Sequence, residues 1–149
     1  MIHRDNRRGY EASSALNQII HREGPRQLTI GDVDTYCIRI NGNGPATVRL
    51  IEHKQPEQRI KMMQAIALES FGRALQCAAA QQLVADNSGV FVLRGQLTAS
   101  SGGRRKVDFA GPQTLQTIDG KPVREFAKRG ELWDWLCCGQ PHSLRNEAF

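Results

Sequence analysis

Two short charged segments contain the residue types in this chain that could do chemistry together. Gly31-Asp32-Val33-Asp34 carries two carboxylates at alternate positions, and Glu52-His53-Lys54 carries a carboxylate and an ammonium at the same spacing. Side chains at alternate positions of a β-strand point to the same face. Carboxylates from two neighbouring strands repel unless a cation lies between them, and a hard divalent ion such as Mg²⁺ fits that place. The two segments therefore predict a magnesium site.

A hairpin would bring the two segments together. Val33–Ile40 and Ala46–Glu52 are rich in β-branched and aromatic residues, which favour strands. Between them, Asn41–Pro45 has the Asn, Gly and Pro residues of a tight turn. We therefore expect two antiparallel strands joined by a short loop.

The register of this hairpin decides which charged groups meet. If Ile40 lies opposite Ala46, then Asp34 lies opposite Glu52. A slip by two residues would place Asp34 opposite Lys54 instead. Neighbours on one face of an antiparallel pair lie about 4.5–5.5 Å apart at Cβ. In either register, two carboxylates and one ammonium converge.

The predicted site suits the hydrolysis of phosphodiesters. A Mg²⁺ ion held by one or two carboxylates keeps several waters and accepts phosphate oxygens as ligands. Such an ion lowers the pKa of a bound water and neutralises the charge that builds up on the phosphate. The ammonium of Lys54 beside it would orient the attacking water or stabilise the transition state.

These residues resemble the active-site signature of the PD-(D/E)XK nuclease superfamily. By position, Asp34 matches the aspartate of that signature and Glu52 and Lys54 match its E-x-K, while Asp32 is the rival or helper of Asp34. The resemblance implies an α/β fold with an αβββαβ restriction-endonuclease-like core, in which a central mixed sheet is flanked by helices. It also implies cleavage of DNA with Mg²⁺, for which Mn²⁺ would substitute. No Q-x-x-x-Y motif follows, which counts against the RecB-like exonuclease branch.

One helix and one strand are predicted before the hairpin. Apolar residues at helical spacing predict a helix over Asn6–Arg22, and Gly24-Pro25 ends it. Arg26–Ile30 is short and partly β-branched, and predicts the first strand. The nucleases that the chain resembles often place an extra metal-directed acid on this helix, which makes Glu11 and Glu23 candidates. Glu11 is preferred because it lies inside the helix.

A long helix is predicted after the hairpin, from Gln55 to about Ala85. Its apolar residues at steps of three and four form one stripe, which we expect to face the core: Ile60, Met63, Ala67, Phe71, Ala74 and Ala78. Glu69 and Arg73 have the spacing of an i,i+4 ion pair. Gln58 and Lys61, in the first turn, would contact the nucleic acid or else face solvent.

The second half of the chain begins with a buried strand and continues with a basic loop. Val90–Leu93 is a continuous apolar run, which predicts a strand buried on both faces beside the hairpin. Arg104, Arg105 and Lys106 end a loop of small residues and would follow a phosphate backbone, or else keep an exposed loop soluble. Two further strands and a helix are predicted at Val107–Ala110, Thr114–Ile118 and Arg124–Leu136.

Length and composition predict one domain. A chain of 149 residues with 40% hydrophobic residues can bury a core without disulfides. We expect the nuclease-like core at about residues 6–95 and a basic C-terminal extension at about 96–149. The net charge of +5 favours a polyanionic partner. No signal peptide or membrane span is visible, so we expect no membrane partner and a cytoplasmic location in a bacterial or phage-infected cell.

The sequence therefore predicts a divalent-metal-dependent DNA endonuclease, either specific for junctions, nicks or branched DNA or associated with phage and defence. A resolvase would be a homodimer, because cutting both strands needs two sites. P-loop, zinc-protease and serine-hydrolase motifs are absent, so those activities have no support. The alternative is a basic nucleic-acid-binding or assembly protein on the same scaffold without activity, in which the acids and Lys54 form only a salt-bridged face.

Overall fold

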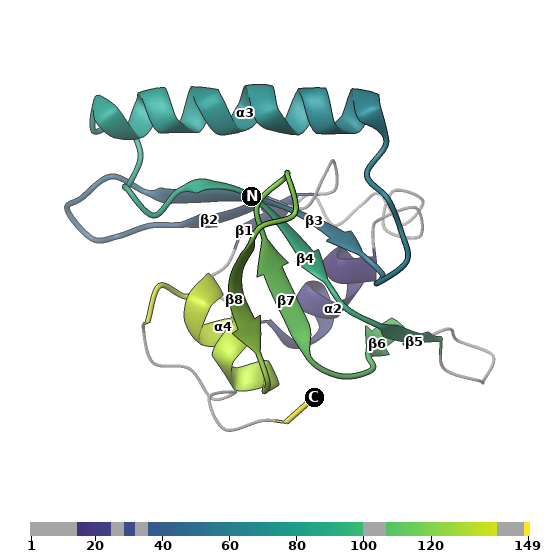
Figure 1. Ribbon diagram of the computed structural model, residues 1–149. Coiled ribbons are helices and arrows are strands. Elements are labelled where there is room, and N and C mark those ends of the chain that lie inside the picture. The colour runs from purple at the N-terminus through teal and green to yellow at the C-terminus, as the bar shows by residue number, and fades with distance from the viewer. Residues whose placement is uncertain (1–14, 25–28, 32–35, 100–106, 140–147) are drawn as a thin grey trace, which may run out of the picture.

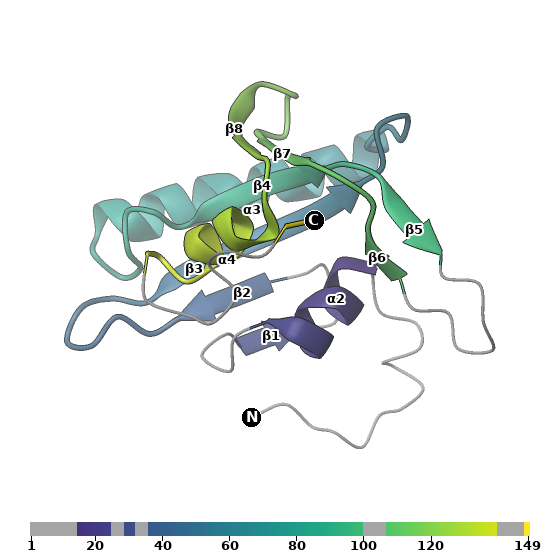
Figure 2. The same cartoon turned by 90° about the horizontal axis from the view of Figure 1, so that it is seen from below.

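The computed structural model describes residues 15–24, 29–31, 36–99, 107–139 and 148–149. Along the chain its helices and strands are α2 (Ala15–Glu23), β1 (Thr29–Gly31), β2 (Tyr36–Arg39), β3 (Thr47–Lys54), α3 (Met62–Ala80), β4 (Gly89–Arg94), β5 (Leu97–Ala99), β6 (Val107–Phe109), β7 (Gln113–Gln116), β8 (Pro122–Phe126) and α4 (Arg129–Leu136). The central sheet has the strand order β1-β2-β3-β4-β7-β8. Helix α3 covers one face and α2 and α4 cover the other (Figures 1 and 2). The predicted α/β fold, a mixed sheet flanked by helices, is confirmed.

The predicted hairpin is formed by β2 and β3, with Tyr36 opposite Leu50 and Ile38 opposite Val48. This is the register that follows from pairing Ile40 with Ala46. In the loop, Gly42 adopts a φ of 54°, which glycine tolerates because it has no Cβ. The side chain of Asn41 donates a hydrogen bond of 3.0 Å to the carbonyl of Pro45 and so closes the turn. The predicted register is confirmed over the paired residues that the structure describes.

Strand β4 confirms the predicted buried strand and runs parallel to β3, with α3 as the connection between them. Val92 and Leu93 are both 1% exposed although they point to opposite faces of the sheet. The pairing sets Glu52 beside Val92 and Lys54 beside Arg94. The carboxyl ends of β3 and β4 therefore lie together.

The main core lies between the sheet and the helices α2 and α4. It is built from buried apolar side chains of both helices and of the sheet, among them Leu16, Ile19, Ile20, Ile51, Leu93, Phe126, Leu132, Trp133 and Leu136. Trp133 is completely buried, and the ring of Trp135 meets that of Phe91 edge-on with centroids 5.1 Å apart. Both tryptophans thus anchor the C-terminal helix to the sheet.

The predicted helix from Gln55 to Ala85 is wrong at both ends, because α3 spans only Met62–Ala80. Residues 55–61 instead form an irregular connection that begins with a turn at Pro56-Glu57. Its backbone carbonyls accept hydrogen bonds from the guanidinium of Arg94, so they are satisfied without a helical turn. The first turn of α3 therefore begins after Gln58 and Lys61, which were predicted to lie within it.

The predicted core stripe of this helix is also wrong, because Met63 is 72% exposed and Phe71 is 50% exposed. The buried residue of α3 is Leu68, which lies about 100° round the helix from the middle of the predicted stripe. Gly72 lies on this same side, where a Cβ would come within 3.8 Å of Val90. This side of α3 packs against β4, and most of the predicted stripe lies on the exposed side of the helix.

The segment after β4 differs from the prediction in its helix boundary. Residues 124–126, predicted as helix, belong to β8, and α4 begins at Arg129. A turn at Asp119-Gly120, where Gly120 has a φ of 88°, folds β8 back on β7 as a hairpin. Strand β7 itself pairs with β4, and β5 pairs with β6 in a small second sheet. The predicted C-terminal extension thus widens the central sheet and contributes to its core.

Candidate active site

Glu52 and Lys54 lie on the same face of β3, at its carboxyl end. Ile51 belongs to the core on the side of α2 and α4, so alternation places Glu52 and Lys54 on the side of α3. The ammonium of Lys54 lies 3.1 Å from a carboxylate oxygen of Glu52, and the two side chains are only 15% and 17% exposed. The sequence predicted this juxtaposition, and the structure forms it.

His53 points to the opposite face, where its Nε2 lies 2.9 Å from Oε1 of Gln113. The amide nitrogen of Gln113 donates to the carbonyls of Gln96 and Gly111, so its oxygen must accept from His53. This fixes the neutral imidazole with its proton on Nε2. Burial lowers the pKa of His53 below 6.5, although the hydrogen bond that His53 donates to Gln113 opposes the shift. His53 therefore acts as a neutral hydrogen-bond donor that holds β3 in place on the face opposite Glu52 and Lys54.

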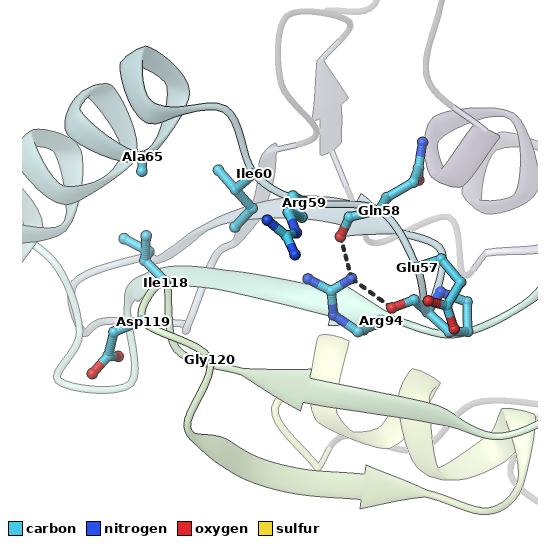
Figure 3. Close-up of a pocket in the computed structure, with 10 residues that line it drawn as sticks. Glu57, Gln58, Arg59, Ile60, Ala65, Arg94, Ile118, Asp119 and Gly120 are labelled. Carbon is cyan, nitrogen blue, oxygen red and sulfur yellow. Dashed lines mark hydrogen bonds between the residues drawn. The ribbon is translucent and has the colours of Figure 1, made fainter.

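Arg94 holds the connection that leaves the site. It is the register partner of Lys54 on β4. Its Nη1 donates to the carbonyls of Gln55 and Gln58 at 2.8 and 2.6 Å, and its Nε donates to the side chain of Gln116 at 3.2 Å. Figure 3 shows the guanidinium directed at the backbone of this connection. Sequence reasoning missed Arg94, although its position directly after the buried run of β4 is a usable signal.

A hollow of about 480 Å³ adjoins this connection (Figure 3). It lies between the residues that follow Lys54, the start of α3 and the turn between β7 and β8, and it is lined by Pro56, Glu57, Gln58, Arg59, Ile60, Ala65, Arg94, Ile118, Asp119 and Gly120. Neither Glu52 nor Lys54 is among the lining residues, so the hollow is a neighbour of the candidate site and not the site itself.

The predicted nucleic-acid contacts have mixed outcomes. Gln58 is exposed in the connection, where its side-chain oxygen accepts a 2.8 Å hydrogen bond from the backbone of Gln55. Lys61 is exposed at the position just before α3. Other predicted residues lie outside the residues that the structure describes: Asp32, Asp34, Glu11, Arg104, Arg105 and Lys106.

Glu23, the alternative to Glu11 as an extra acid, is bound elsewhere. Both of its carboxylate oxygens accept from Nη1 of Arg129, at 2.7 and 2.6 Å, and Nη2 of Arg129 bonds to Asp108 at 3.0 Å. Burial raises the pKa of Glu23, while the charge of Arg129 opposes the shift. Glu23 thus joins α2 to α4 and does not belong to the candidate site.

The donors that the structure describes are compatible with magnesium but do not complete a site. Glu52 offers the hard carboxylate oxygens that Mg²⁺ prefers, and this ion commonly takes only one or two carboxylates and fills its other positions with water. In the described ranges, no group of three or more His, Cys, Asp or Glu side chains could hold a metal. A second carboxylate from Asp34 or Asp32 would complete the predicted ligand set.

Comparison of the chain with models of known protein families, with curated proteins and with solved structures finds no match. Within the described part of the chain, no helix is both long and apolar enough to cross a membrane. The candidate site therefore rests on the chemistry and geometry of its own residues.

Proposed function

We propose that this protein is a divalent-metal-dependent DNA endonuclease with a restriction-endonuclease-like core of the PD-(D/E)XK kind. The observation that carries the proposal is the pair formed by Glu52 and Lys54, 3.1 Å apart on one face at the end of a central strand. The order of elements from α2 to β4 supports it. One helix precedes three consecutively antiparallel strands, and a second helix leads to a strand parallel to the third, as the αβββαβ resemblance implies.

The hairpin register supports Asp34 as the partner of Glu52. Tyr36 lies opposite Leu50; in the sequence, Asp34 precedes Tyr36 by two residues and Glu52 follows Leu50 by two. The proposal requires the same ladder to continue by one pair on that face, which would set Asp34 opposite Glu52. Asp34 and Glu52 would then hold Mg²⁺, with Asp32 or Glu11 as an additional acid.

Each residue of the proposed site has a defined task. When bound, Mg²⁺ supplies charge neutralisation on the phosphate and a water of lowered pKa. Glu52 fixes its carboxylate at the end of β3, and Lys54 presents an ammonium with three N–H donors within reach of it. In a DNA complex, Lys54 would hydrogen-bond the attacking water or a phosphate oxygen, as charge builds up there. His53 and Arg94 keep β3 and its connection in place on the two faces of the sheet.

The environment of this pair favours a functional role over a purely structural one. Both side chains are more than four-fifths covered, so each side chain has lost most of its contact with water. The attraction within such a pair commonly does no better than offset that loss, and apolar residues would stabilise the fold equally well. A contribution to the stability of the fold therefore explains poorly why a glutamate and a lysine occupy these positions. A role in phosphodiester hydrolysis explains it better.

DNA would approach the sheet end that carries Glu52 and Lys54. Gln58, Arg59 and Lys61 are exposed on the adjoining connection, and Arg104, Arg105 and Lys106 are proposed as further contacts to the phosphate backbone. The net charge of +5 suits a polyanionic substrate. Arg94 is used to hold the connection, so it is assigned to positioning and not to DNA.

The second candidate function is DNA binding without cleavage on the same scaffold. It is favoured by the closed contact between Glu52 and Lys54, which satisfies both charges within the chain. In this case the basic groups would still attract DNA, but the pair would hold no metal and the protein would cut nothing.

The two functions are separated by incubating the protein with supercoiled plasmid, single-stranded DNA and a four-way junction, each in Mg²⁺, Mn²⁺ or EDTA. Wild type is compared with Lys54→Ala and with Lys121→Ala, which alters an exposed lysine on a turn. Metal-dependent cleavage that disappears in Lys54→Ala and persists in Lys121→Ala supports the nuclease. Binding by all three proteins without cleavage of any substrate supports the binding protein instead.

A further inference from the structure

Helix α3 lies over one face of the sheet (Figure 1), and on its side away from the sheet it exposes apolar side chains. We call this surface the α3 stripe, and it consists of Met63, Ile66, Ala67, Ser70, Phe71 and Ala74. Met63 is 72% exposed, and Ile66 and Phe71 are each 50% exposed. Contiguous exposed apolar side chains are uncommon on a monomer and mark surfaces of interaction.

The α3 stripe has no polar group that needs water. Ser70 is its one polar residue, and its hydroxyl donates a hydrogen bond of 2.9 Å to the carbonyl of Ile66 within the helix. The small side chains of Ala67, Ser70 and Ala74 also leave a shallow surface between the larger ones. Another helix could therefore pack closely here without leaving a buried donor unpaired.

The charge of α3 argues against DNA or a lipid surface as the occupant. The helix contains only two charged residues, Glu69 and Arg73, whose charges cancel. DNA contacts need a cluster of cations, and helices that lie on membranes carry Lys and Arg beside their apolar face. A neutral apolar stripe instead suits a protein surface of the same character.

The α3 stripe is complementary to a second copy of itself. If two α3 helices pack antiparallel about a two-fold axis near Ser70 and Phe71, the large ring of Phe71 meets the small Ser70 of the other copy, and the two stripes overlap along their length. Glu69 and Arg73 lie on the same flank, two residues on either side of Phe71. The symmetry therefore sets each glutamate at the level of the arginine of the other copy, at the edge of the interface, where their long side chains can meet.

The ion pair between Glu69 and Arg73 that their spacing predicts within the helix is not formed. Among the described residues, neither side chain has an ion pair, so both are free to pair across the axis. We propose that the α3 stripe is the interface of a homodimer in which two α3 helices pack antiparallel about this axis. The dimer rests on α3 alone and does not depend on the nuclease proposal.

The first test measures the dimer by analytical ultracentrifugation of the full chain. Phe71→Glu should raise the dissociation constant by about thirtyfold or more, the scale expected when a central apolar anchor is lost and a charge is buried unpaired. Circular dichroism should stay unchanged, because Phe71 is half exposed in the protomer. Glu69→Arg alone should weaken the dimer, and adding Arg73→Glu should restore it, because the pairs across the axis are then reversed and complementary.

The second test locates the axis by oxidative cross-linking. In a Cys77→Ser background, which removes the exposed thiol of α3, Ser70→Cys should form a disulfide between copies. Gln76→Cys, on the flank nearer to the sheet, should not. Three results would each overturn the proposal. The wild type could be monomeric, the dimer could survive Phe71→Glu, or the α3 stripe could form a dimer only after residues 1–14 are deleted.

Discussion

His53 and Gln113 form a hydrogen bond of 2.9 Å between side chains sixty residues apart, directly behind the face of β3 that carries Glu52 and Lys54. Gln113 is completely buried and uses its amide nitrogen on two backbone carbonyls. A fully bonded buried amide restricts the positions of the segments that it joins. The strand of the candidate site is thus held from the core side, while its charged groups face the other way.

Adding a side chain at Gly95 should destabilise the protein, because it would collide with the side-chain amide of Gln113. A Cβ at Gly95 would lie 2.4 Å from the side-chain atoms of Gln113, which has no space to move. Gly95→Ala should therefore lower the free energy of unfolding by about 1–3 kcal/mol, measured by urea denaturation. Gly111→Ala is the matched control, because a Cβ there meets nothing within 4 Å. Equal stability of the two variants would contradict the packing around Gln113.

His53 should make stability depend on pH. Burial lowers the pKa of His53 in the folded state below its ordinary value of 6.5, so the unfolded chain binds a proton that the folded chain does not. The stabilisation is complete above about pH 6.5 and is lost as the pH falls towards the folded pKa. Urea midpoints measured between about pH 8 and about pH 5 should fall more steeply for wild type than for His53→Gln. Parallel pH profiles would show that His53 is not buried as described.

Arg94→Ala should loosen the connection between β3 and α3. The guanidinium donates to the carbonyls of Gln55 and Gln58. Its removal takes this donor from the carbonyl of Gln58 and leaves the carbonyl of Gln55 with only the bond from the backbone N–H of Gln58. Amide hydrogen exchange over residues 55–61 should become at least about tenfold faster, while exchange in the core strands changes little. Arg124→Ala, an exposed arginine on β8, should leave the connection unchanged. Equal exchange in both variants would remove Arg94 from its positioning role.

The four cysteines should differ in reactivity according to their burial. Burial raises the pKa of Cys37 to about 12, so its thiolate is absent at neutral pH, whereas Cys77 is exposed on α3. In the Phe71→Glu variant, which removes the proposed dimer, a thiol reagent should modify Cys77 rapidly and Cys37 only after unfolding. Mass spectrometry of the labelled peptides identifies the sites. Rapid labelling of Cys37 in the folded protein would contradict its place in the core.

The hairpin and its register could be predicted because their determinants are local. The turn residues Asn41–Pro45 and the apolar strands beside them leave few alternatives, and alternation then puts Glu52 and Lys54 together. The buried strand β4 could be predicted for the same reason, since its apolar run is uninterrupted. These are the parts of the fold on which the candidate site depends.

Other features could not be predicted because they depend on distant contacts. The start of α3 is set by Arg94, which satisfies the backbone of the preceding connection. The buried side of α3 is set by its packing against β4, where Leu68 is covered and Gly72 lies near Val90. The helix is apolar on more than one side, and its periodicity favoured the wrong one. Residues 124–126 form a strand only because β7 is there to pair with them. Likewise, the residues near His53 in the sequence do not indicate that its hydrogen-bond partner is Gln113, sixty residues away.

The central claim is tested most directly by single-turnover cleavage of DNA in Mg²⁺ by wild type, Glu52→Gln, Lys54→Ala and the double variant. Because the two side chains act as one unit, each single change should reduce the rate by about a hundredfold or more. The double change should then cost little more than the worse single change. Glu125→Gln, an exposed glutamate on β8, is the control for loss of a carboxylate. Cleavage that is unchanged in both single variants, or that persists equally in EDTA, would contradict the assignment of Glu52 and Lys54.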